Sequence, residues 1–417
     1  MIFLKKLNQV NKEKLFKTIF FISLIIVTFN SLSYFFEKYV EGDRYIFFDL
    51  PLNYCAGKLF SNNISPYGFG LGKAPLIECV NNVIKGDWGM PVYIYSPIFL
   101  ELLSVISKLD FNTLKKIWYF ITVLSIFSII FFSYKILPLK NLKKFVPLIF
   151  FFSFGGIFVS ALLSGNISIL GYALICISLI FLHRKKLNIF SYFIIFLSLI
   201  KPHFFVFLLI GFFVYGNEYI KKLIFSLICI VFLYFVFFLL NTDIFFDFFN
   251  AIRATNTSEW FFSFNSTFGL MGIINNIPRI FNNPELNIYF SGGPSILNNI
   301  IWLSLISFIF LGFIYFRLSL KIKDLNDYNK SKLIALGTIL VILINPNITS
   351  YDFLIFIPSV FYLVNEADIS YKFKYFIMTL FILIQDINFP FFVASLIYFL
   401  VIISIIKNYD ILNLNKK

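Results

Sequence analysis

Charged residues are scarce in this chain. Only 13% of its 417 residues are charged, against about 25% in an average soluble protein. Hydrophobic residues make up 59%, and phenylalanine alone occurs 61 times. Apolar runs of roughly 15–22 residues recur along the whole length, which is the length that a helix needs to cross a bilayer. A soluble domain is thereby excluded, and the sequence predicts an all-α polytopic membrane protein.

Patterns that bind metals are also missing. The chain has two histidines and four cysteines, and it contains no Asp-x-Asp motif. We therefore predict no metal and no cofactor. Cys55 and Cys79 fall in a predicted outer segment, where an oxidising compartment would permit a disulfide. Whether their Cα atoms come close enough is not decided by the sequence. Cys176 and Cys229 lie in apolar runs, where they are expected to act as small apolar residues.

The apolar runs and the basic residues together predict a topology. We expect twelve spans, at residues 18–36, 116–137, 145–163, 167–183, 188–200, 203–216, 220–240, 296–317, 332–345, 351–365, 373–387 and 389–406. Most Lys and Arg residues gather in alternate connections, so the positive-inside rule places both termini in the cytoplasm. This rule also explains the net charge of +14 without a nucleic-acid partner. The first span is read as a retained signal anchor, because no small-residue cleavage site follows it.

Two long outer segments remain between the spans, within a single membrane domain of residues 1–417. The apolar run 97–109 is too short to cross a bilayer, and a span there would place the later lysine-rich loops outside. We therefore predict that it lies on the outer surface as an interfacial helix. A second interfacial helix is expected at 49–60, so residues 37–115 form an outer cap. Residues 241–295 form the second long outer loop.

Most polar clusters at the predicted span ends fall on this outer side. They include Asn166, Lys201 with His203, Asn265, and Asp352. Ionisable groups at membrane depth are costly and usually face a cavity or pathway, so this bias favours an enzyme that works at one interface. Asp49 stands at the start of the cap. It is a catalytic base or, in the alternative interpretation, a solvated loop charge.

Several short motifs carry a resemblance to a known family. They are Asp49 with Tyr54-Cys55-Ala56, Asn63 to Tyr67, Tyr93-Ile94-Tyr95-Ser96-Pro97-Ile98, Ser164-Gly165-Asn166-Ile167, Lys201-Pro202, Phe264-Asn265-Ser266-Thr267 and Asn345-Pro346. Their order and spacing over roughly residues 18–365 resemble the family-C glycosyltransferases, specifically glycosyltransferase family 87. The chain departs from the family pattern in having Asn166 where Gln is usual, Ser96 where Pro is usual, and no Gln between Asn265 and Ser266.

The resemblance implies an inverting, metal-independent glycosyltransferase in the plasma (inner) membrane, with its site on the outer, periplasmic face. A polyprenyl-phosphate sugar, mannose or a similar hexose or pentose, would be the donor, and a cell-envelope lipid or glycan the acceptor. Asp49 would be the general base, and Lys201 would hold the donor phosphate. The other candidate substrate-binding residues are His203, Tyr54, Tyr95, Asn166, Asn265, Arg253 and Asp352, with Arg279 as a further alternative to Lys201.

Plainer interpretations stay open for these residues. Lys201 is otherwise a snorkelling side chain at a span end, and His203 a helix-start residue after proline. Tyr54 and Tyr95 fit an aromatic belt at the membrane interface equally well, and Asn is common throughout the chain. Two other functions also remain. A polysaccharide polymerase or ligase would usually have a larger, arginine-rich outer loop, and a lipid or sugar transporter would need charged residues near span centres.

Overall fold

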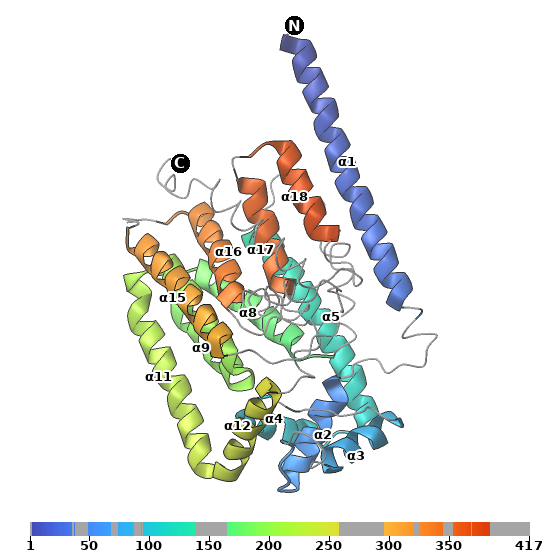
Figure 1. Ribbon diagram of the computed structural model, residues 1–417, viewed down its shortest axis with the longest axis vertical. Coiled ribbons are helices and arrows are strands. Elements are labelled where there is room, and N and C mark those ends of the chain that lie inside the picture. Colours follow the sequence, from blue (N-terminus) through green and yellow to red (C-terminus); the bar gives the residue numbers. More distant parts are fainter. Residues whose placement is uncertain are drawn as a thin grey trace.

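Helices form every regular element in the part of the chain that the computed structural model describes, which is residues 2–35, 37, 49–67, 74–86, 93, 95–137, 165–257, 296–319, 325–344, 353–367 and 369–383. The elements are α1 (Ile2–Phe35), α2 (Asp49–Ser61), α3 (Ala74–Ile84), α4 (Pro97–Ile106), α5 (Phe111–Ile136), α8 (Ser168–His183), α9 (Leu187–Ile200), the 3₁₀ helix η3 (Pro202–Phe207), α10 (Leu208–Tyr215), α11 (Asn217–Leu240), α12 (Thr242–Thr257), α15 (Ile296–Ser319), α16 (Asp327–Ile344), α17 (Phe353–Glu366) and α18 (Tyr371–Leu383) (Figure 1). The all-α class is confirmed over these residues.

The predicted spans largely coincide with these helices. A helix overlies each of them except 145–163 and 389–406, which lie outside the described residues. Two described helices, α5 and α11, are long and apolar enough to cross a membrane. Shorter apolar helices include α8, α9 and the η3–α10 pair. Membrane character is supported, and the number of twelve spans stays a prediction.

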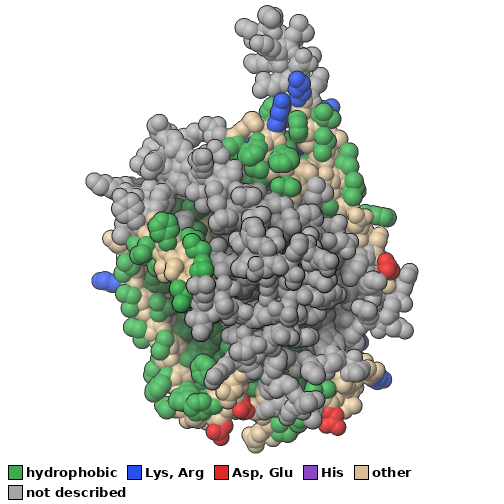
Figure 2. Space-filling model, in the orientation of Figure 1, with side chains coloured by type: hydrophobic (Ala, Val, Ile, Leu, Met, Phe, Trp, Pro, Cys, Tyr) green, Lys and Arg blue, Asp and Glu red, His purple; other side chains and the backbone are tan. Residues whose placement is uncertain are grey.

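The outward faces of α5 and α11 are apolar. Phe127 on α5 and Val231 on α11 are 63% and 67% exposed, and hydrophobic side chains cover the flank formed by α11 and α15 (Figure 2). Such surfaces are unusual on a protein surrounded by water. Buried side chains of the inner helices form the core, in which α8 packs between α5 and α9, and α10 packs against α11 and α16.

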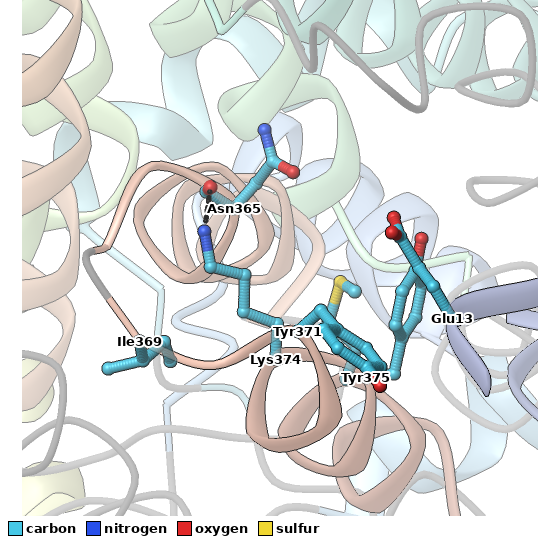
Figure 3. A pocket seen from close by; sticks show the side chains of 7 residues that line it. Glu13, Asn365, Ile369, Tyr371, Lys374 and Tyr375 are labelled. Carbon is cyan, nitrogen blue, oxygen red and sulfur yellow. Dashed lines mark hydrogen bonds between the residues drawn. The ribbon is translucent and has the colours of Figure 1, made fainter. Parts of the chain in front are cut away.

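The long helix α1 packs along α18. Phe20 is fully buried there against Phe361 and Tyr375, at ring-centroid distances of 6.2 and 6.0 Å. The turn between α17 and α18 is closed by Lys374, whose Nζ donates to the carbonyl oxygen of Asn365 at 2.8 Å (Figure 3). A small cavity of about 140 Å³ separates this turn from Glu13 of α1.

Three short helices, α2, α3 and α4, form a cap at one end of the bundle (Figure 1). Gly57 lets α2 approach α4 closely, because a Cβ there would lie 2.3 Å from the carbonyl oxygen of Leu103. A disulfide joins Cys55 of α2 to Cys79 of α3, with 5.8 Å between the Cα atoms. Helices at 49–61 and 97–106 match the two predicted for the cap, and α3 was not anticipated. Their location in a membrane interface stays a prediction.

Candidate functional site

Asp49 is the first residue of α2, and its partly buried carboxylate meets the bundle where α8 begins. Asn166 Nδ2 donates a hydrogen bond to Asp49 Oδ2 at 2.7 Å. The two residues are 117 positions apart in the chain. The cap and the bundle are therefore joined at the carboxylate that the sequence singled out.

The amide of Asn166 is held in one orientation. Gly165 has a φ of 59°, which turns the backbone sharply before α8 and which glycine adopts without strain. The Oδ1 atom of Asn166 accepts from the backbone N–H of Ser168 at 2.8 Å and from Lys201 Nζ at 3.2 Å. Both of these groups are donors, so the amide oxygen must face them and the NH₂ group must face Asp49.

Lys201 reaches the same amide from the end of α9. Pro202 follows it, and a residue before proline is driven out of the helical region. Lys201 accordingly has φ −127° and ψ 108°, and η3 starts directly afterwards. Its Nζ donates to Ser168 Oγ and lies 5.1 Å from the centroid of the Tyr95 ring, a favourable cation–π distance.

Burial sets the electrostatics of this site. Desolvation raises the pKa of Asp49 from 3.8 to about 6, and the hydrogen bond from Asn166 and the charge of Lys201 act in the opposite direction. The carboxylate is thus ionised at neutral pH, yet it is a stronger base than an ordinary aspartate. A pKa close to the working pH suits a general base.

Hydrogen bonds fix the segment that carries Tyr95. The hydroxyl of Tyr67 donates to the Tyr95 carbonyl oxygen at 2.7 Å. Tyr234 of α11 bridges the next residue to α9, because its hydroxyl lies 2.9 Å from both Ser96 Oγ and the Ser198 carbonyl oxygen. Ser96, the departure from the family's usual proline, thereby supplies an oxygen that proline lacks.

The remaining predicted residues pack against other side chains or lie outside the described residues. Tyr54 packs against Phe111 of α5 at 5.3 Å between ring centroids. His203 stands in η3 against the ring of Phe204. Arg253 belongs to α12, but its side chain is not described. Asn265, Asp352 and Arg279 lie outside the described residues. Their roles stay predictions.

Two polar residues of the site were missed from the sequence. Ser168 is completely buried and binds Lys201, and its place two residues after Asn166 was the available signal. Asn53 lies one turn after Asp49 and so shares its helix face. Its side chain is 3% exposed, and its Oδ1 has no hydrogen-bond partner among the described residues.

The described residues hold no group of three or more His, Cys, Asp or Glu side chains that could bind a metal ion. The candidate site instead offers one carboxylate (Asp49), one ammonium group (Lys201) and the amide of Asn166 between them. This set can take up a proton and hold a negative charge close by. The prediction of a metal-independent reaction remains a prediction.

Comparison with known proteins identifies the family. The profile of glycosyltransferase family 87 matches residues 93–346, more than half of the chain. No curated protein and no solved structure gives a significant match. Tyr95, Asn166 and Lys201 lie within the matched residues, whereas Asp49, Tyr54 and Asp352 lie outside them. The match over more than half of the chain shows that the protein belongs to glycosyltransferase family 87. Together with the apolar helices, it identifies a membrane glycosyltransferase.

Proposed function

We propose that this glycosyltransferase transfers a single sugar from a polyprenyl-phosphate donor to an acceptor hydroxyl, with Asp49 as the general base. One observation carries the proposal: a carboxylate with a pKa of about 6 is separated from a lysine ammonium by the single amide of Asn166. The base, Asp49, and the positive charge that would bind the phosphate, Lys201, would stand on the two sides of a bound sugar. The acceptor is a lipid or glycan of the cell envelope.

The donor, the acceptor and Asp49 account for every bond and proton in the proposed reaction. The acceptor oxygen attacks the anomeric carbon and its proton passes to Asp49. The bond from the anomeric carbon to the phosphate oxygen breaks, and the electron pair leaves on the polyprenyl phosphate. A single displacement of this kind inverts the anomeric centre. Asn166 occupies Oδ2 of Asp49, so Oδ1 is the oxygen that would accept the proton.

Lys201 would bind the leaving phosphate. Fixed positive charge in a partly buried site stabilises developing negative charge more strongly than in water. Lys201 is held by Asn166, Ser168 and the Tyr95 ring, so little reorganisation would be needed when the phosphate arrives. The Tyr95 ring beside it offers an apolar surface for the sugar or for the first isoprene unit.

Two features support a location of the site on the outer face of the membrane. The Cys55–Cys79 disulfide belongs to the cap, and disulfides persist in oxidising compartments. The opposite end of the bundle carries exposed basic residues, as cytoplasmic ends do. Labelling with an impermeant maleimide tests this orientation. A cysteine at Lys108 should react in intact cells, and one at Lys185 should react only after permeabilisation. The reverse pattern would place the site on the cytoplasmic face.

The donor can be tested with purified protein in nanodiscs. Synthetic polyprenyl-phosphate mannose and GDP-mannose are offered in parallel, with a panel of octyl glycosides as acceptors and a chelator present. We expect transfer and release of polyprenyl phosphate from the lipid donor alone, and a product of inverted configuration. Transfer from the nucleotide sugar, or retention of configuration, would refute the proposal.

A further inference from the structure

A second polar cavity lies at the other end of the bundle, well away from Asp49. Its volume is about 580 Å³. The last turn of α5, the turn between α8 and α9, and the first turn of α16 line it. We call this region the basic end, because its lining includes Lys135, Arg184, Lys185 and Lys330, with Asp327 as the acidic member.

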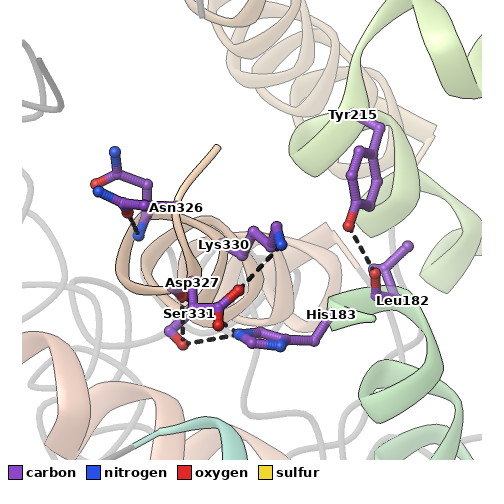
Figure 4. A network of polar contacts seen from close by, with 8 residues as sticks. Leu182, His183, Tyr215, Asn326, Asp327, Lys330 and Ser331 are labelled. Carbon is purple, nitrogen blue, oxygen red and sulfur yellow. Dashed lines mark hydrogen bonds and ion pairs between the residues drawn. The ribbon is translucent and has the colours of Figure 1, made fainter. Parts of the chain in front are cut away.

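A hydrogen-bond network holds the wall of this cavity together (Figure 4). His183 Nε2, at the end of α8, lies 3.3 Å from the Asp327 carbonyl oxygen and 3.5 Å from Ser331 Oγ. Ser331 Oγ also donates to the Asp327 carbonyl oxygen at 3.0 Å. On the other side of α8, the Tyr215 hydroxyl donates to the Leu182 carbonyl oxygen at 2.8 Å. The contacts of His183 thus fix α8 to α16, and the contact of Tyr215 fixes α8 to α10.

The basic residues of this cavity are not all neutralised by acidic partners. Lys330 pairs with Asp327 at 3.0 Å, and Lys185 pairs with Glu218 at 2.9 Å. Lys135 and Arg184 form no ion pair with any described residue, and both are exposed. The cavity therefore presents positive charge, which is complementary to an anionic group such as a phosphate.

The surface of α5 beside the cavity indicates where that phosphate comes from. Phe127, Phe131 and Tyr134 are 63%, 57% and 45% exposed. Their spacing of four and three residues puts them on one helix face, and this apolar stripe ends at Lys135. An acyl chain can lie along the stripe while its headgroup reaches the cavity. A free phosphate ion would use the charges but would make no contact with the stripe.

We propose that the basic-end cavity binds the headgroup phosphate of an anionic phospholipid, with Lys135 and Arg184 as its phosphate contacts and the Phe127–Phe131–Tyr134 stripe as the acyl-chain surface. Basic pockets between membrane helices suit such headgroups. The site lies at the opposite end of α5 from the cap, so it is separate from the sugar-transfer site and does not depend on the proposed reaction. Its role would be to anchor α5, α8 and α16 to the bilayer surface.

Native mass spectrometry and thermal stability of the full-length protein provide the test. The detergent-purified protein is titrated with phosphatidylglycerol, with phosphatidylcholine and with inorganic phosphate. We expect phosphatidylglycerol to stay bound and to raise Tm, while the other two have little effect. The double variant Lys135→Gln/Arg184→Gln should bind phosphatidylglycerol roughly tenfold more weakly or worse.

The matched control is Lys108→Gln/Lys221→Gln, which removes the same charge from exposed positions outside the cavity and should bind like the wild type. The variant Lys135→Arg/Arg184→Lys keeps the charge and should retain binding, which separates a binding defect from a folding defect. The proposal is overturned if the Gln double variant binds normally, if both Gln variants lose binding equally, or if inorganic phosphate alone gives the full increase in Tm.

Discussion

In the candidate site, where the cap meets the bundle, the charged groups are few and enclosed, whereas at the basic end they are more numerous and mostly open to solvent. Asp49 and Lys201 share a single buried amide. Arg184 and Lys185 stand exposed on a turn. Burial shifts the pKa of Asp49 to about 6, while hydrogen bonding and the charge of Lys330 lower the pKa of the exposed Asp327. Enclosure, rather than the number of charges, raises the pKa of a carboxylate here.

The largest expected effect comes from removing the enclosed carboxylate. Asp49→Asn leaves no base for the acceptor proton, so transfer should fall by roughly 10²–10⁴-fold. Asp49→Glu should also be slow, because its carboxylate is displaced and near-attack geometry is strict. Initial rates of transfer from the lipid donor in nanodiscs provide the measurement.

The matched control is Glu101→Gln, which neutralises an exposed carboxylate of the cap and should leave the rate unchanged.

The stability of the Asp49 variant gives a second measurement. The raised pKa means that the fold favours protonated Asp49, so this stabilisation is complete below pH 3.8 and is lost as the pH rises through about 6. Asp49→Asn should therefore unfold at a higher temperature than the wild type at pH 8, with the difference vanishing near pH 4. A rate near that of the wild type would assign the base to another residue, such as Asp352.

The next largest effect is expected at Lys201. Lys201→Ala should weaken use of the lipid donor by about 2–4 kcal/mol in transition-state stabilisation, with little effect on the KM of the acceptor. Lys201→Arg should retain part of the activity, since the charge remains. The measurement is kcat/KM with each substrate varied in turn. Lys221→Ala, which removes an exposed lysine of α11, is the control. Equal losses for both substrates would favour the snorkelling interpretation of Lys201.

The contrast between the two ends also explains what could be predicted from the sequence. Apolar runs determine helices directly, because backbone groups in a membrane must be paired within the segment. Two of the three cap helices, at 49–61 and 97–106, were predicted, as was the break at Lys201-Pro202, and Asp49, Asn166 and Lys201 were chosen as candidate residues. Helix α3 was missed because its eleven residues are too short and too mixed to stand out as an apolar run.

Long-range contacts were harder to predict. Nothing in the sequence indicated that Asn166 would bridge residues 49 and 201, because that contact depends on how the cap and the bundle meet. Tyr54 packs against Phe111, and because five residues along a helix bring a side chain to a different face from Asp49, its role in the site stays a prediction. The sequence left open whether Cys55 and Cys79 pair. The packing of α2 against α3 brings the two residues together as a disulfide.

A smaller effect is expected from opening that disulfide. Cys55→Ser/Cys79→Ser releases a loop of 24 residues, which should lower the free energy of unfolding by about 3 kcal/mol. The effect should be concentrated in the cap, so hydrogen exchange should increase in α2 and α3 while α9 and α11 stay protected. Cys229→Ala is the control, since that cysteine is free. Uniform loss of protection across the bundle would mean that the cap is not a separate unit of stability.

The smallest effect is expected from Asn166, and it tests whether enclosure tunes Asp49. The proposed general-base role requires ionised Asp49, so the wild-type rate should fall by half near pH 6 and continue to fall below it. The hydrogen bond from Asn166 stabilises the carboxylate and lowers its pKa. Asn166→Ala removes that donor, so the pKa of Asp49 should rise and the acidic limb of the pH–rate profile should move to higher pH. Lys330→Ala, which changes a charge at the basic end, should leave the limb where it is. An unmoved limb in Asn166→Ala, with a lower rate at every pH, would show that Asn166 positions the substrate and that burial alone sets the basicity of Asp49.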